Sequence, residues 1–140
     1  MNRHEIRKEV FKAVFASEFH EEALKQGIVD LFLSGRDMAE EEDLKKNNKT
    51  DEDALYIKSK AEDIILKTPE LDAVINDKVD GWKTSRMAKV DLTLIRLALY
   101  EMKYEDIPVG VAINEAVTLA DEFGTDNSSS FVNGALAKLI

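Results

Sequence analysis

The sequence predicts an all-α fold for a single domain of 140 residues. Apolar residues recur at helical spacing in the long segments that lack proline and glycine. The chain contains only six glycines and two prolines, too few for a sandwich or barrel. No hairpin signal is present, and hydrophobic residues make up 44% of the chain, enough for a real core. We therefore expect about seven helices over residues 1–140, without an internal repeat.

The first part of the chain predicts two helices followed by a linker. Residues 3–19 lack proline and glycine, and their apolar stripe consists of Ile6, Val10, Ala13 and Val14. Residues 21–33 predict a second helix, in which Gly27 is a weak point. Residues 34–50 have no lasting period and contain the acidic run EEED, so we expect a solvated connection there.

Capping signals define the next two helices. Thr50 supplies a capping oxygen, and the three acidic residues after it favour a helix that runs to about Lys67. Pro69 suits the first turn of another helix, which we expect to continue to about Val79 and to end at Gly81.

The remaining helices carry strong boundary signals. Asp91 is the expected N-cap of a helix that is apolar nearly all round, which predicts a buried central helix. Pro108 and Gly124 bracket the next helix, and Asp126 or Asn127 is the expected cap of the last one.

Polar residues within the last two helices have two interpretations. Asn114 and Asn133 are poor helix formers, and we expect their amides to fasten these helices to neighbouring helix ends; direct ligand contact is the alternative. Ser130 and Phe131 follow a helix start with free N–H groups, which suits a phosphate, although an apolar residue there is more often part of the core.

The sequence lacks the motifs of several enzyme and cofactor classes. It has no cysteine, no P-loop, no dinucleotide-binding glycine motif and no HExxH pair, so we expect no catalysis, no cofactor and no metal. It also lacks an apolar run long enough to span a membrane and a signal-peptide core, which indicates a cytoplasmic protein.

Charge is distributed unevenly along the chain. The net charge of −9 opposes nucleic-acid binding, yet residues 1–12 carry four basic and two acidic side chains. Within the first helix, basic residues flank an aromatic row: Arg3, His4, Arg7, Lys8 and Lys12 beside Phe11, Phe15 and Phe19. This pattern suits single-stranded RNA, but aromatic residues at this spacing are more often core and lysines beside them more often snorkel.

Three segments together resemble the NusB family of bacterial transcription antitermination factors. The run GWKTSRMAKVDLTLIRLALYE is similar to the family's lead into its LRLALYE-type helix. The ending VAINEAVTLADEFGTDNSSSFVNGALAKL matches the family's paired VAINEA and FVNG blocks, which are highly specific. The N-terminal helix resembles the family's arginine-rich start, and the match is weakest over residues 20–75.

The resemblance implies a fold, a function and partners. It implies two packed three-helix bundles, which we place at about residues 1–80 and 81–140. It also implies binding of the boxA segment of ribosomal RNA leaders together with the ribosomal protein NusE, within the RNA polymerase antitermination complex. The oligomeric state, monomer or homodimer, stays open.

The resemblance also assigns site residues by position. The RNA-side residues are Arg3, His4, Arg7, Lys8, Phe15, Ser130 and Phe131. The protein-partner surface lies near Trp82, Arg86 and Asp91. The family's lysine before VAINEA is Gly110 here, and its Asp-Ser-x-Lys before FVNG is Asn-Ser-Ser-Ser. Because basic residues are lost, we expect weak intrinsic RNA affinity that a protein partner raises.

Two other functions compete with this interpretation. One is a helical protein-interaction module or dimer without an RNA role. The other is an RNA-binding domain appended to an rRNA methyltransferase, which we disfavour because the chain has no cofactor-binding domain.

Overall fold

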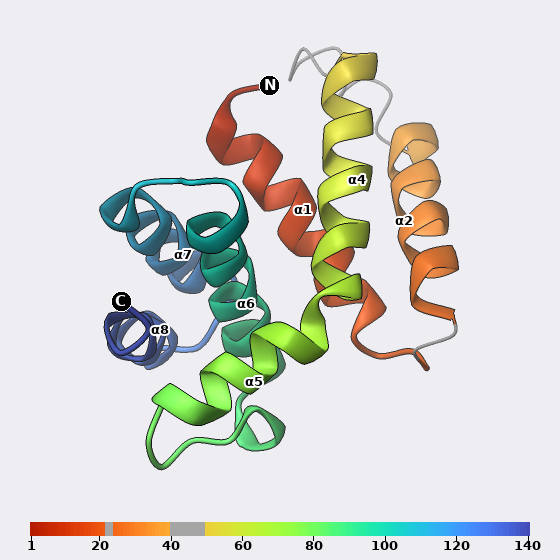
Figure 1. Cartoon of the computed structure of the whole chain (residues 1–140). Coiled ribbons are helices and arrows are strands. Elements are labelled where there is room, and N and C mark those ends of the chain that lie inside the picture. Colours follow the sequence, from red (N-terminus) through yellow and green to blue (C-terminus); the bar gives the residue numbers. More distant parts are fainter. Residues whose placement is uncertain (22–23, 40–49) are drawn as a thin grey trace. The chain divides into compact units, whose positions relative to one another are not determined.

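The computed structural model describes residues 1–21, 24–39 and 50–140 (Figure 1). Within these ranges the chain forms seven α-helices and one short 3-10 helix, and no strand, which confirms the all-α prediction. The described chain divides into two compact units, Met1–Leu66 and Lys67–Ile140. No helix in these ranges is long and apolar enough to cross a bilayer.

The first unit is a bundle of three helices that all contact one another. These are α1 (Arg3–Ser17), α2 (Lys25–Ala39) and α4 (Asp51–Leu66). Their core comprises Val10, Phe11, Ala13, Val14, Val29, Ile57, Ala61, Ile64 and Ile65. These residues repeat at three- and four-residue spacing because one face of each helix turns inward.

The helix α2 differs from its predicted bounds at both ends. It begins at Lys25, and it continues to Ala39 through residues predicted to be linker. Loss of an amphipathic period does not end a helix, since arginine, methionine and alanine in this stretch are good helix formers. Residues 40–49, the rest of the predicted linker, lie outside the described part of the chain.

Reciprocal caps set the N-terminal ends of α1 and α4. The Glu5 N–H donates to Asn2 Oδ1 at 2.8 Å, and the Asn2 N–H donates to Glu5 Oε2 at 3.3 Å. The Asp53 N–H donates to Thr50 Oγ1 at 3.0 Å, and the Thr50 N–H donates to Asp53 Oδ2 at 3.3 Å. Each capping box satisfies two N–H groups that would otherwise lack partners.

The second unit is built around a buried central helix, α6 (Lys89–Tyr104), whose residues from Asp91 to Glu101 are all buried. It packs with α7 (Val109–Phe123) and α8 (Ser128–Ala137), and these three helices contact one another. Helix α5 (Thr68–Lys78) packs on α6 and on the 3-10 helix η2 (Thr84–Arg86). The central-helix prediction is confirmed.

An ion pair attaches α5 to α6. Arg96 Nε donates to Asp72 Oδ1 at 2.8 Å, and Arg96 Nη2 donates to Asp72 Oδ2 at 2.7 Å. This two-pronged geometry is the strong form of an arginine–carboxylate pair. Because α5 is tied to α6, the division between units falls between Leu66 and Lys67, whereas the resemblance placed it near residue 80.

One predicted cap is corrected, and another is confirmed in position only. Ala88 occupies the N-cap of α6, so Asp91 lies within the first helical turn, where its charge suits the helix dipole. Asn127 occupies the N-cap of α8 but its side chain makes no capping hydrogen bond. Instead, Ser128 Oγ accepts a hydrogen bond from the Thr125 N–H at 2.9 Å.

Candidate nucleic-acid interface

The basic residues predicted to bind RNA on α1 differ in how far they reach the surface. Arg3 is exposed, and His4 and Lys8 are half-buried. They occupy the first two turns of α1, whose start is fixed by the Asn2–Glu5 capping box. These turns therefore present cationic side chains from a well-ordered backbone.

Arg7 behaves differently from the other basic residues of α1. Its exposed fraction is only 5%. It shares a helix face with Val10, Phe11 and Val14, at i, i+3, i+4 and i+7, and that face forms part of the core. In this conformation Arg7 supports the fold, and its guanidinium is not an open surface for phosphate.

The aromatic row runs from the core to the surface. Phe11 is 2% exposed, Phe15 is half-buried, and Phe19 is 63% exposed. The rings of Phe11 and Phe15 stack at 5.7 Å between centroids, and Phe15 and Phe19 meet edge to face at 5.1 Å. Phe19 therefore offers more open ring surface than Phe15, although the resemblance assigned only Phe15.

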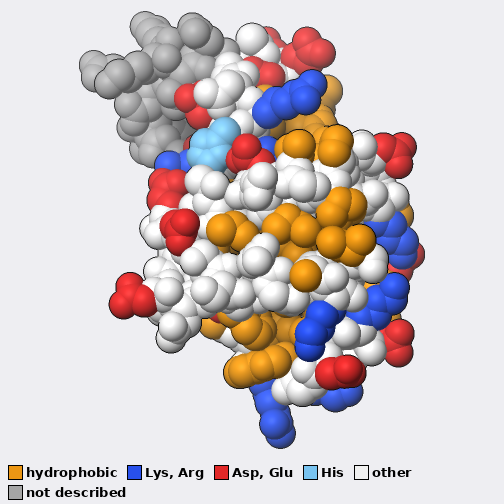
Figure 2. Space-filling view, turned by 90° about the vertical axis from the view of Figure 1, so that its left-hand side faces the viewer, with side chains coloured by type: hydrophobic (Ala, Val, Ile, Leu, Met, Phe, Trp, Pro, Cys, Tyr) orange, Lys and Arg blue, Asp and Glu red, His pale blue; other side chains and the backbone are white. Residues whose placement is uncertain are grey.

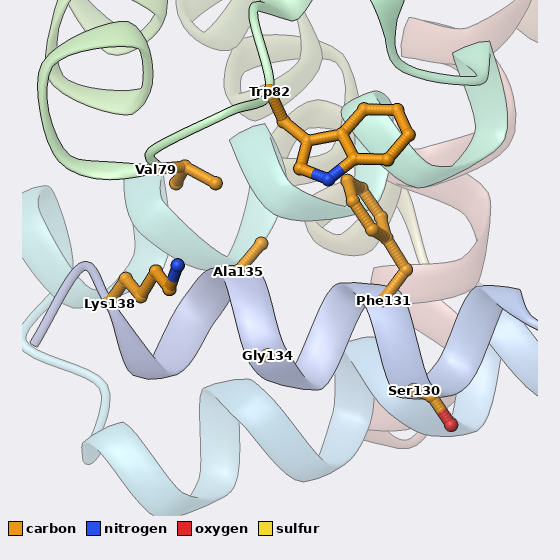
Figure 3. Close-up of a pocket in the computed structure, with 7 residues that line it drawn as sticks. All are labelled: Val79, Trp82, Ser130, Phe131, Gly134, Ala135 and Lys138. Carbon is orange, nitrogen blue, oxygen red and sulfur yellow. The ribbon is translucent and has the colours of Figure 1, made fainter.

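In the second unit the structure brings together residues that the sequence assigned to different surfaces. The rings of Trp82 and Phe131 meet edge to face at 5.1 Å, with an angle of 73° between their planes. Both border a pocket of about 250 Å³, whose lining is Val79, Trp82, Ser130, Phe131, Gly134, Ala135 and Lys138 (Figure 3). Figure 3 also shows the Ser130 side chain pointing away from Trp82. Sequence spacing alone gives no signal for the contact between Trp82 and Phe131.

The other two residues of the predicted partner surface lie in unlike environments. Arg86 is exposed at the end of η2, whereas Asp91 is 8% exposed in the first turn of α6. The Oδ1 atom of Asp91 is buried and has no hydrogen-bond partner among the described residues. Only Trp82 and Arg86 of this group present an accessible side chain.

The structure corrects the role expected of the two asparagines. Asn114 and Asn133 are both exposed, and neither side chain hydrogen-bonds to a neighbouring helix end within the described part of the chain. The amide of an exposed asparagine keeps its bonds to water, so burial does not force a protein partner on it. The last two helices are held by their apolar faces, among them Ala116, Leu119 and Val132.

The surface also carries hydrophobic side chains that no predicted site uses. In unit 2, Val109 is 38% exposed, Val111 46% and Ile140 72%. Figure 2 shows hydrophobic side chains gathered on one face of the molecule, bordered by lysine, arginine, aspartate and glutamate side chains. Such patches often mark protein-binding surfaces.

Comparison with known proteins places this arrangement in a family. The model of the NusB family matches residues 4–140. The chain is 49% identical over 142 aligned residues to the transcription antitermination protein NusB of Agathobacter rectalis, covering 99% of this chain and 98% of that protein. It is 40% identical to the protein of the same name from Lachnoclostridium phytofermentans, covering 100% and 99%. The solved structure of T. maritima NusB matches with a TM-score of 0.80 and 28% identity, covering 99% of this chain and 90% of that one. The chain therefore belongs to the NusB family of transcription antitermination proteins.

Proposed function

We propose that this protein binds single-stranded boxA-type RNA of ribosomal RNA leaders, together with the ribosomal protein NusE, as part of the RNA polymerase antitermination complex. The observation that carries the proposal is the surface of α1. An exposed Arg3 and a half-buried Lys8 lie on the same helix as the half-buried Phe15, and the exposed Phe19 follows in the turn after this helix. Membership of the NusB family supports transcription antitermination as the setting.

The side chains divide the work of binding RNA between two kinds of contact. Arg3 and Lys8 neutralise phosphates, and His4 adds a hydrogen-bond donor beside them. Phe19 and the Phe131 ring of the second unit supply flat apolar surface on which bases stack. Arg7 acts through the position of α1, since its side chain is buried.

The charge balance sets the strength of this binding. With a net charge of −9, the protein as a whole repels a polyanion such as RNA. Only a few basic side chains at the start of α1 attract the RNA phosphates. We therefore propose weak binding by the protein alone. A NusE-type partner that adds its own phosphate contacts raises the affinity.

The test is a titration of labelled boxA-type RNA with the full chain, with and without the NusE-type protein. The double variant Arg3→Ala/Lys8→Ala removes two proposed phosphate contacts, and Lys78→Ala removes an exposed charge from α5 as a matched control. The double variant weakens RNA binding at least tenfold while Lys78→Ala leaves it unchanged. Equal binding by the wild type and the double variant excludes α1 as the RNA site.

The variant Arg7→Ala is less suitable for testing the RNA contact of α1. Because Arg7 is buried and engaged within the fold, its removal perturbs the first unit as well as any contact with RNA. A loss of RNA binding in that variant therefore has two explanations. Removal of the exposed Arg3 and the half-buried Lys8 disturbs the fold less.

A second candidate function, a protein-interaction module without RNA binding, is favoured by the exposed hydrophobic residues Val109, Val111 and Ile140. It predicts that the NusE-type protein binds with or without RNA, and that RNA never binds. The same titration distinguishes the two functions, and sedimentation of the chain alone distinguishes a monomer from a homodimer.

A further inference from the structure

The pocket beside Phe131 has a floor and a wall from different elements. The floor consists of three residues of α8 and its C-cap residue, at i, i+3, i+4 and i+7: Phe131, Gly134, Ala135 and Lys138. Val79 and Trp82, which lie on either side of the turn between α5 and η2, form the wall (Figure 3). Both the floor and the wall belong to the second unit.

The turn that carries the wall is fixed by backbone geometry. Gly81 has a φ of +81°, in the left-handed region that other residues adopt at a cost. It directs the chain from the end of α5 so that Trp82 meets Phe131 while about half of the indole, 48%, stays exposed. The pocket is therefore flanked by a large ring with an open surface.

The pocket combines an apolar flat surface with a positive charge. The Trp82–Phe131 pair lies at one end, and Figure 3 shows the Lys138 side chain at the other end of the same face of α8. Seven residues separate Phe131 from Lys138, which corresponds to about 10 Å along the helix axis. Small or apolar residues, Gly134 and Ala135, occupy the space between them.

We propose that this pocket binds one nucleotide of single-stranded RNA, with the base against the Trp82–Phe131 pair and a phosphate at Lys138. The inference rests on the proposed function and adds Trp82 and Lys138 to the RNA-contacting residues. Every base has a π-face, so an aromatic wall accepts one without sequence preference. An ammonium group on an otherwise acidic protein is the complement of a phosphate.

The size of the pocket favours a small occupant. Its volume of about 250 Å³ is below the roughly 300–1,000 Å³ typical of pockets for larger ligands. A single ring system with a phosphate on an exposed lysine needs only partial enclosure, because the rest of the nucleotide remains in solvent. An aromatic side chain of a protein partner is the competing occupant, which the test separates.

Trp82 is the only tryptophan in the chain, so its fluorescence reports directly on the pocket. Titration of the full chain with boxA-type RNA, in the presence of the NusE-type protein if needed, quenches this emission if a base stacks on the indole. Trp82→Ala, followed by anisotropy of labelled RNA, weakens binding roughly five- to a hundredfold, and Trp82→Phe restores most of the affinity.

Two further variants change the pocket floor. A Cβ at Gly134 meets no atom within 4 Å, so the backbone accepts a side chain there, and Gly134→Leu introduces an apolar side chain at the pocket floor. Lys138→Gln removes the charge, and Lys83→Gln removes an exposed charge next to Trp82 that does not line the pocket. The inference predicts that Gly134→Leu and Lys138→Gln weaken RNA binding about tenfold or more relative to Lys83→Gln, with unchanged circular dichroism.

The outcomes separate this inference from the proposed function. If Arg3→Ala/Lys8→Ala weakens RNA binding while the pocket variants bind as the wild type does and the indole emission stays constant, the pocket does not bind a nucleotide and the proposed function stands. If the pocket variants lose only the NusE-type protein, the pocket holds a protein side chain and the inference is overturned. If the wild type binds no RNA even with the partner, both fail.

Discussion

At the scale of single residues, the Asp72–Arg96 pair is the most consequential polar contact described. The Arg96 side chain is 5% exposed and the Asp72 side chain 22% exposed, so the guanidinium depends on protein partners in place of water. We expect Asp72→Ala to destabilise the second unit by about 2–4 kcal/mol, because the buried Arg96 guanidinium then lacks the Asp72 carboxylate as its partner. Urea unfolding followed by Trp82 fluorescence measures this. Asp72→Asn keeps one acceptor, so we expect it to lower the free energy of unfolding by less than Asp72→Ala does. Equal losses of stability in the two variants contradict the explanation.

Two glycines predict opposite effects of the same substitution. A Cβ at Gly124 collides with the Ser128 side chain and lies 2.8 Å from the Ala120 carbonyl oxygen, so we expect Gly124→Ala to destabilise by roughly 1–3 kcal/mol. At Gly134 nothing lies within 4 Å, and Gly134→Ala is expected to stabilise α8 by about 0.5–1 kcal/mol, since alanine is the better helix former. Thermal unfolding of both variants checks the signs, and a lower Tm for Gly134→Ala contradicts the account.

The burial and the contacts of single side chains are the features that the sequence predicts least well. Arg7 and Arg3 carry the same charge on the same helix, yet Arg7 is buried and Arg3 is exposed. The sequence gives opposite signals for Arg7, because its spacing with Val10 and Val14 indicates a buried face whereas its charge favours the surface. The Trp82–Phe131 contact had no such signal, since 49 residues separate the two rings and only the packing of α8 brings them together.

At the scale of elements, charged residues connect neighbouring helices at the surface. Lys103 Nζ lies 3.2 Å from Glu70 Oε1, between α6 and α5. The Tyr104 hydroxyl first and the Lys103 ammonium second lower the pKa of Glu70 below its usual 4.5. Glu70 in turn raises the pKa of Lys103 above 10.5 and that of Tyr104 above 10.0.

The signs of these shifts define a pH window. A lowered carboxyl pKa adds stability above about pH 4.5 that is lost as pH falls, and the raised pKa values of Lys103 and Tyr104 add stability that is lost as pH rises past about 10. We expect Glu70→Gln to flatten both limbs of a Tm-against-pH curve slightly, because the Glu70 and Lys103 side chains are exposed. Asp77→Asn, on the same helix, is the control. Identical curves for Glu70→Gln and the wild type refute the link.

Helix boundaries show which element features can be predicted. The start of α4 and the end of α5 were predicted because Thr50 and Gly81 act locally. Asn2 caps α1 in the same local way, although no cap was predicted there. The start of α6 was not, because an aspartate suits both the N-cap and the first turn, and Asp91 occupies the latter. The Asn114 and Asn133 interpretation failed for a related reason: a polar residue in a helix has no need of a partner when its face is open to water.

At the scale of the whole molecule, the fold class and family followed from pattern and motif, whereas RNA affinity depends on total charge. With a net charge of −9 and two or three phosphate contacts, we expect log K against log salt to have a slope of roughly −1.4 to −2.1. Titrations at several salt concentrations measure it. Tight binding by the chain alone with a much steeper slope contradicts the proposed division of contacts between the protein and its partner.

The left-handed backbone at Gly81 has a consequence for how the pocket can vary. The turn before Trp82 contains a dihedral angle that only glycine adopts cheaply, so any other residue at this position strains the turn. We expect such a substitution to shift the indole relative to Phe131. A single mutation at Gly81 can therefore change the geometry of the Trp82–Phe131 pair without altering either aromatic residue.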